Sequence, residues 1–286
     1  MNKALLIGIT KYPTAPLSGC INDITAMANF LVDHNIFTEK EIRLLADNRA
    51  TTKAIFDRLE WLVKEIKRGD KLFFYYSGHG AQMATRDKHG EVDGLDEVIC
   101  PVDFDWSEEK TVRDKDFDRI FSKIPEGVEF IWISDSCHSG DLTSAEHHYF
   151  YGHEKNEVDK EMISDKAERG TSKSMPQPAD IQWRSHTAHT EKIIQHKKKG
   201  YNLAFISGCR PEQVSRDAKF GKVYHGALTY CLLKVLSKKG LNKPLDELVE
   251  ETRLLLKKNK FRQIPQLEGS DAIIEKPFFD IKKIKK

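Results

Sequence analysis

The fold of this chain is read most directly from the stretch Val128-Glu129-Phe130-Ile131-Trp132-Ile133-Ser134-Asp135-Ser136-Cys137-His138-Ser139-Gly140. Its first half is a short run of β-branched and aromatic residues, which predicts a buried strand rather than a helix. The run stops abruptly at small and polar residues, with a cysteine at the stop. Because side chains two residues apart lie on the same face of a strand, Asp135 and Cys137 are expected to point the same way.

A second stretch, Lys71-Leu72-Phe73-Phe74-Tyr75-Tyr76-Ser77-Gly78-His79-Gly80, has the same construction. Here an apolar strand ends on a histidine between two glycines, which allow another part of the chain to approach closely. If the two strands are parallel neighbours, His79 and Cys137 meet at the carboxyl edge of the sheet. Open α/β sheets place their functional sites at that edge.

The rest of the chain alternates between short apolar runs and segments with helical spacing. Strands are expected over residues 3–9, 42–46, 71–77, 97–101, 128–134 and 201–207, and helices over residues 20–35, 51–67, 116–123, 225–238 and 245–258. This alternation with tight connections predicts a mostly parallel sheet with helices on both faces. Residues 144–200 differ, because they carry charges of both signs and six of the eleven histidines without a sustained apolar period. That composition predicts a flexible insertion or linker.

Composition restricts the class of protein. With 39% hydrophobic and 31% charged residues the chain resembles an ordinary soluble globular protein. The formal charge of +2 gives no argument for nucleic-acid or membrane binding, and the basic tail at residues 282–286 is interpreted as a solvated terminus rather than a nucleic-acid patch. No apolar run reaches the length of a membrane span, and residues 3–9 are too short for the core of a signal peptide.

The five cysteines, at positions 20, 100, 137, 209 and 231, show no paired spacing. This fits neither a disulfide framework nor a zinc site, and it indicates a reducing, cytoplasmic setting. In such a setting a single cysteine can serve as a nucleophile.

Cys137 and His79 together supply the parts of nucleophilic catalysis. A nearby histidine can lower the pKa of a thiol and later protonate a leaving amine. The backbone amides of Cys137 and Gly80 are the candidate oxyanion donors. His138 is a rival base, but on an extended strand it would face away from Cys137. On spacing alone, an inert core cysteine and a turn histidine remain the commoner interpretation.

The two quoted blocks, Tyr75–Gly80 and Asp135–Gly140, resemble the catalytic blocks of the metacaspases and their bacterial relatives, within the caspase-like cysteine peptidases. Other segments resemble the family in the same order: Leu5–Ile9, Gly19–Asp23, Asp93–Glu97, Pro101–Asp103, Ser207–Cys209, Gln213, Gly226–Tyr230 and Pro265–Leu267.

The resemblance implies a single peptidase domain over residues 1–286, with a caspase-like three-layer α-β-α sandwich around a mostly parallel sheet. Residues 1–143 would form the region like a large subunit, 144–200 a flexible charged linker, and 201–286 the region like a small subunit. His79 would be the base and Cys137 the nucleophile. The resemblance also implies autoprocessing in the linker and a monomeric enzyme without an organic cofactor.

The same resemblance implies an acidic pocket. Asp23 and Asp135 match its two carboxylates, with Cys20 and Ser77 beside them. Two carboxylates facing one slot would hold arginine or lysine by charge-assisted hydrogen bonds, so the expected substrates are peptides cleaved after Arg or Lys. Two alternatives stay open: an aspartate-specific caspase-like peptidase, and a catalytically silent scaffold that keeps the fold for protein interaction.

Many metacaspases bind calcium through loop aspartates, and oxygen ligands suit that ion. Asp96, Asp114 and Asp116 match such positions, and Asp141 or Ser144 could supply the ligand beyond the nucleophile. A set of solvated acidic loops is the rival interpretation.

Overall fold

The computed structural model describes the chain except for residues 85–94, 138–168, 179–201, 212, 240 and 280–286. Six strands form its central sheet, in the order β12-β9-β7-β3-β1-β2. These strands are β1 (Lys3–Gly8), β2 (Ile42–Ala46), β3 (Lys71–Ser77), β7 (Glu129–Asp135), β9 (Asn202–Ser207) and β12 (Gln266–Gly269). All neighbouring pairs are parallel except β12 and β9, which confirms the predicted mostly parallel sheet.

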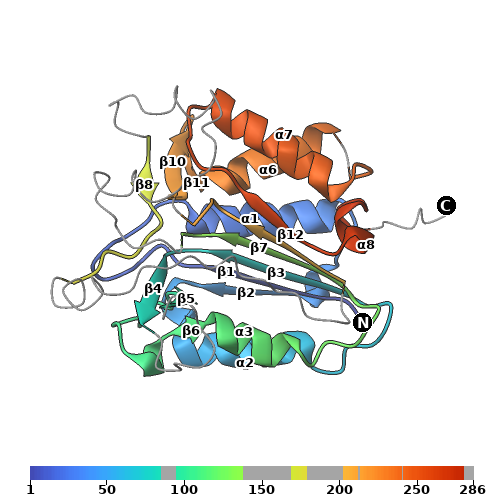
Figure 1. Ribbon diagram of the computed structural model, residues 1–286, viewed down its shortest axis with the longest axis horizontal. Coiled ribbons are helices and arrows are strands. Elements are labelled where there is room, and N and C mark those ends of the chain that lie inside the picture. Colours follow the sequence, from blue (N-terminus) through green and yellow to red (C-terminus); the bar gives the residue numbers. More distant parts are fainter. Residues whose placement is uncertain (85–94, 138–168, 179–201, 212, 240, 280–286) are drawn as a thin grey trace, which may run out of the picture.

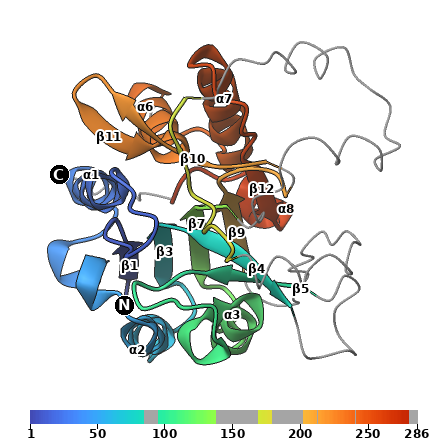
Figure 2. The same ribbon diagram turned by 90° about the vertical axis from the view of Figure 1, so that its left-hand side faces the viewer.

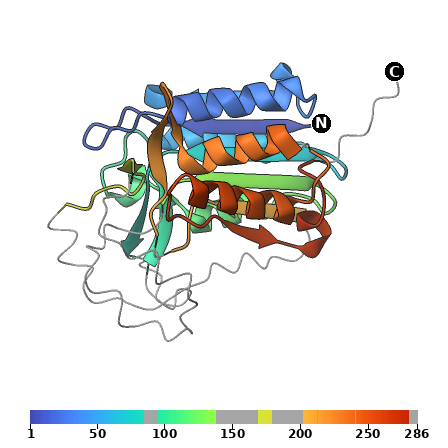
Figure 3. The same cartoon turned by 90° about the horizontal axis from the view of Figure 1, so that it is seen from above.

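Helices cover both faces of this sheet (Figure 1). The helices are α1 (Cys20–Asp33), α2 (Thr52–Val63), α3 (Asp114–Phe121), α6 (Ala227–Lys239), α7 (Leu245–Lys258) and α8 (Asp271–Ile274), with 3-10 turns at Glu39–Glu41, Asp47–Arg49 and Glu108–Lys110. Helices α1, α6 and α7 lie on one face, as the view from above shows, and α2 and α3 lie on the other (Figures 1 and 3). The expected three-layer α-β-α sandwich is therefore confirmed.

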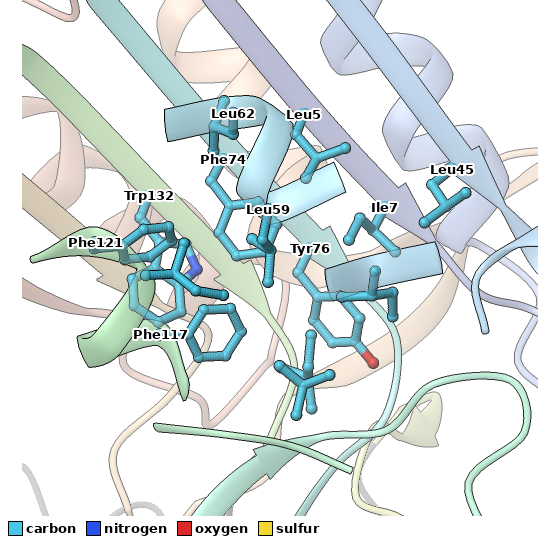
Figure 4. Packing of buried hydrophobic residues seen from close by; sticks show 14 of the residues in the cluster. Leu5, Ile7, Leu45, Leu59, Leu62, Phe74, Tyr76, Phe117, Phe121 and Trp132 are labelled. Carbon is cyan, nitrogen blue, oxygen red and sulfur yellow. The ribbon is translucent and has the colours of Figure 1, made fainter. Parts of the chain in front are cut away.

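Strand β3 shows why the central strands read as continuous apolar runs. Phe73 and Tyr75 pack into the core cluster that contains α1, α6 and α7 residues, whereas Phe74 and Tyr76 pack into the cluster that contains α2 and α3 residues. All four side chains are fully buried. Figure 4 shows the second cluster, where the Phe74 ring lies 5.6 Å from that of Trp132. Burial of one such side chain contributes about 1.5–3 kcal/mol.

Two helices differ from their predicted bounds for local reasons. Helix α2 begins as expected, because the Thr51 hydroxyl accepts a hydrogen bond from the Ala54 amide, but it ends at Val63 instead of Lys67. The backbone becomes extended at Lys64 and Glu65 has a φ of +60°, which a helix cannot contain. Helix α6 begins at Ala227, two residues later than predicted, so His225 lies on a strand.

Two small sheets lie at the carboxyl end of the central strands (Figure 1). One contains β4 (Gly80–Ala84), β5 (Leu95–Ile99) and β6 (Val112–Arg113). The other contains β8 (Thr171–Ser172), β10 (Arg216–Phe220) and β11 (Val223–Gly226). Of the segment expected to be a flexible linker, residues 169–178 are described: β8 pairs with β10, and Lys173 is buried.

None of the described helices combines the length and the apolar character needed to cross a bilayer.

Candidate active site

His79 and Cys137 follow neighbouring strands at the same level of the sheet. Strands β3 and β7 pair in parallel with Ser77 opposite Asp135, so each candidate catalytic residue comes two positions later. Gly80 shows how closely the two blocks approach. A Cβ atom on Gly80 would lie 1.9 Å from the carbonyl oxygen of Cys137, so a side chain at this position would collide with the backbone of Cys137.

The contacts of His79 define its tautomer. Its Nε2 lies 2.7 Å from the carbonyl oxygen of Ala15, and a carbonyl oxygen can only accept. Nε2 therefore carries the proton, and in the neutral ring Nδ1 keeps its lone pair. Among the described residues, the buried Nδ1 has no hydrogen-bond partner. Burial lowers the pKa of His79 to about 4, so the ring is neutral at pH 7 and able to accept a proton at Nδ1.

The thiol of Cys137 is fully buried against Ser215. The Ser215 amide nitrogen lies 2.6 Å from Sγ, and the Ser215 carbonyl oxygen lies 3.3 Å from it. The residue just before β10 thus fixes the thiol at the end of β7. The rival base, His138, lies outside the described residues.

The two predicted pocket carboxylates, Asp23 and Asp135, are both fully buried. Asp23 accepts hydrogen bonds from the Gly226 amide (2.9 and 3.1 Å) and from Ser77 Oγ (2.8 Å). His225 Nδ1 lies 2.9 Å from the other side of the same carboxylate. Because an unpaired buried charge costs several kcal/mol, a cation placed between the two carboxylates would stabilise the pocket.

Asp135 is held by residues from the second half of the chain. It accepts from Ser215 Oγ at 2.9 Å, and from the amide and hydroxyl of Thr229 at 3.0 and 2.5 Å. Cys20, the first residue of α1, is also buried, and burial raises the pKa of its thiol well above the usual value. The structure therefore brings all four predicted pocket residues together.

The cation in this pocket is Lys173. Its Nζ lies 3.1 Å from Asp135 Oδ1 and 3.6 Å from Asp23 Oδ2. It donates to Ser77 Oγ at 2.9 Å and to the Asp135 carbonyl oxygen at 3.0 Å. Although burial opposes the charged form, the carboxylates of Asp135 and Asp23 raise the pKa of Lys173 above its ordinary value. The ammonium group is therefore retained inside the protein.

The backbone around Lys173 lies between the two small sheets (Figure 2). The Lys173 amide donates to the Ser215 carbonyl oxygen at 3.0 Å, and the Gly80 amide donates to the Lys173 carbonyl oxygen at 3.0 Å. Two residues later the Met175 amide donates to the Gly80 carbonyl oxygen at 2.9 Å, so the segment pairs in parallel with the first residue of β4. The segment thus lies extended across the ends of the catalytic strands, with one side chain in the acidic pocket.

Sequence reasoning missed several residues of this site. Lys173 is one of many lysines in a polar segment, and nothing in the local sequence distinguishes it. Thr229 and Gly226 belong to a stretch that resembles the family, but the sequence assigned them no role in the pocket. Ser215 belongs to no motif. The missed residues are joined to the pocket by contacts between distant parts of the chain, for which a single sequence carries no signal.

The candidate calcium ligands that the structure describes form ion pairs and hydrogen bonds with other residues of the chain. Asp96, only 1% exposed, forms ion pairs with the Arg113 guanidinium and with Lys115 Nζ, which is 2.9 Å from Oδ1. Asp114 accepts from the Lys115 amide, and Asp116 accepts from the Arg113 amide at the start of α3. Within the described ranges no three acidic, histidine or cysteine residues form a group that could hold a metal, and Asp141 lies outside those ranges. The described residues do not fit a calcium ion.

This chain is similar to known proteins over most of its length. Residues 2–146 match the family model for the metacaspase, peptidase C14 domain. Metacaspase-1 of Lodderomyces elongisporus is 33% identical over 296 residues, which cover 95% of this chain and 65% of that protein. Metacaspase-3 of Trypanosoma brucei brucei is 32% identical over 295 residues, which cover 95% of this chain and 71% of that protein.

A crystal structure of protein GSU0716 from Geobacter sulfurreducens shares the fold, with a TM-score of 0.67, 20% identity and 98% coverage of each chain. The sequence matches go further than the fold, because they include the segments that carry His79 and Cys137. This chain belongs to the metacaspase family of cysteine-type endopeptidases.

Proposed function

We propose that this chain hydrolyses peptide bonds after lysine or arginine, with Cys137 as nucleophile and His79 as general base. The observation that carries the proposal is the Lys173 ammonium group between two buried carboxylates, Asp23 and Asp135. The chain binds one of its own basic side chains where a substrate side chain would go. We propose further that it cleaves itself between Lys173 and Ser174.

The charge of the pocket supports basic specificity. Two carboxylates buried without a cation are costly, and a lysine or arginine side chain removes part of that cost. Lysine supplies a compact charge with three donors, and arginine supplies a planar fork that suits carboxylates. A substrate aspartate would add a third negative charge to the same pocket, which argues against the aspartate-specific alternative.

The contacts of the Lys173 carbonyl support the cleavage step. Its oxygen already accepts from the Gly80 amide at 3.0 Å, a distance suited to stabilising an oxyanion. In the proposed step His79 takes the Cys137 proton, and the thiolate attacks the Lys173 carbonyl carbon. The peptide bond to Ser174 then breaks as His79 protonates the leaving nitrogen. Water, activated by His79, hydrolyses the thioester and restores the thiol.

The test follows the fate of the purified full chain by intact mass and by sequencing new amino termini. We expect a fragment that begins at Ser174 and that is absent in Cys137→Ala. Lys173→Arg should keep this cut, and Lys173→Met should lose it. Lys222→Met, at an exposed lysine, is the matched control and should be cut like the unmodified chain.

A second arm measures hydrolysis of matched peptides ending in Arg, Lys or Asp. Cleavage after Asp alone would refute the acidic pocket while leaving the dyad. If none of the peptides were cleaved and an arginine-mimicking electrophile failed to label Cys137, the silent scaffold would be the better interpretation. Cleavage of the chain that persists in Cys137→Ala would exclude Cys137 as the nucleophile.

A further inference from the structure

The ion cluster around Asp96 has a chemistry of its own. Asp96 lies on β5, and its buried carboxylate faces two cations from the next segment of the chain, Arg113 on β6 and Lys115 on α3. Glu108 stands farther off, with Oε1 3.7 Å from Arg113 Nη2. One buried negative charge therefore has two tethered positive charges beside it.

A divalent cation and these two side chains would compete for the same carboxylate. Calcium binds carboxylate oxygens at about 2.3–2.6 Å. Lys115 Nζ already lies 2.9 Å from Asp96 Oδ1, and the Arg113 guanidinium is paired with Oδ2. A divalent cation bound to Asp96 would be repelled by the positive charges of Arg113 and Lys115, unless both side chains moved away.

The small sheet β4-β5-β6 connects the cluster to the active site. Val98, two residues after Asp96, pairs with Arg113 on one side and with Ala81 on the other. Strand β4 begins at Gly80, whose amide binds the Lys173 carbonyl oxygen. The Cys100 amide, just after β5, donates to the His79 carbonyl oxygen at 3.0 Å. A positive charge that pairs with the Asp96 carboxylate therefore stabilises the strands that hold Gly80 and His79.

We propose that Arg113 and Lys115 take the place of a divalent cation at Asp96. The two side chains supply the positive charge of such an ion as part of the covalent chain, so the active-site strands are held in place without calcium. The site is an internal substitute for a metal, and the enzyme functions equally in the presence of calcium and of a chelator.

The test uses thermal melting of the full chain with Cys137→Ala, which keeps the chain intact whether or not it is a peptidase. We expect the melting temperature to change by less than about 1 °C between chelator and millimolar calcium. Adding Lys115→Asp replaces a cation by a potential ligand beside Asp96. This variant should melt lower in chelator and regain roughly 5 °C with saturating calcium, as ligand linkage gives for a chain of this size.

Two controls separate ligand creation from loss of an ion pair. Lys115→Met removes the cation without adding a ligand, so it should melt lower in both buffers and gain little from calcium. Lys222→Asp adds the same carboxylate at an exposed site and should show no calcium response.

Two results would overturn the proposal. One is calcium stabilisation of the chain with Lys115 intact that disappears in Asp96→Asn. The other is peptidase activity of the unmodified chain that falls more than about tenfold in chelator and returns with calcium. If Lys115→Asp fails to fold, the chain with Lys115 intact still decides the question in these two assays.

Discussion

Gly226 is the position where a single added methyl group tests the acidic pocket most directly. A Cβ atom there would lie 2.1 Å from Asp135 Oδ2 and 2.4 Å from Lys173 Nζ, whereas ordinary contact begins at 3.4 Å. The backbone itself can accept alanine, because Gly226 is not among the glycines with positive φ. Gly226→Ala should therefore fold, with its pocket partly filled.

The expected loss follows from these distances. A basic side chain would have to retreat by about 1 Å, which weakens its bonds to the carboxylates. Hydrogen bonds to charged groups contribute about 1.5–3 kcal/mol each, so losing one or two of them costs roughly 3–4 kcal/mol. Because each 1.36 kcal/mol is a factor of ten in rate, kcat/KM for a peptide ending in Arg should fall about 100- to 1000-fold.

The assay compares kcat/KM, self-cleavage and melting temperature for Gly226→Ala and Gly221→Ala. Gly221 has open space around it but a φ of +62°, so its alanine variant carries backbone strain without filling the pocket. We expect this control to lose some stability and to keep its activity. A folded Gly226→Ala chain that cleaves after Arg within tenfold of the unmodified rate would show that the basic side chain binds elsewhere.

Three further predictions concern charge, pH and packing. Asp135→Asn keeps the shape of the pocket but removes one charge, so kcat/KM for peptides ending in Arg should fall about 30-fold. Asp23→Asn should lower kcat/KM by a similar factor. Unchanged kinetics in both variants would contradict the acidic pocket. The pKa of His79 is about 4 in the folded state and about 6.5 when unfolded, so the unfolded chain binds more protons between these values. Stability of the Cys137→Ala chain should thus be complete above pH 6.5 and fall by up to about 3 kcal/mol as the pH drops through 4, and His79→Gln should flatten this slope in urea titrations. Phe74→Ala should lower the free energy of unfolding by about 3–5 kcal/mol, and a loss below 1 kcal/mol would mean that the ring cluster of Figure 4 can collapse around the gap.

The elements that were predicted well are those with strong local patterns. The bounds of β2 and α7 match the predicted strand 42–46 and helix 245–258, and the two strands that end at His79 and Cys137 are parallel neighbours as expected. A short apolar run bounded by polar residues predicts a buried strand without knowledge of its neighbours, so the sheet could be inferred from sequence alone.

The elements that were missed depend on contacts between distant parts of the chain. β8 has only two residues, and it exists because β10 offers an edge to pair with. Helix α3 begins two residues before the predicted start, because the Asp116 carboxylate accepts from the Arg113 amide. The ion pairs of Asp96 could not be predicted for the same reason, since the sequence does not show that Arg113 and Lys115 lie beside a carboxylate on β5.

The position of Lys173 has a consequence for the kinetics of this enzyme. A side chain tethered in the pocket acts at an effective concentration in the millimolar range or above, which free substrates rarely reach. In the proposed self-cleavage, the first bond that Cys137 attacks therefore belongs to the chain itself. Under the proposed function the onset of activity is first-order, with a half-time independent of protein concentration. The time before activity appears is then set within each molecule and does not depend on an encounter with another copy.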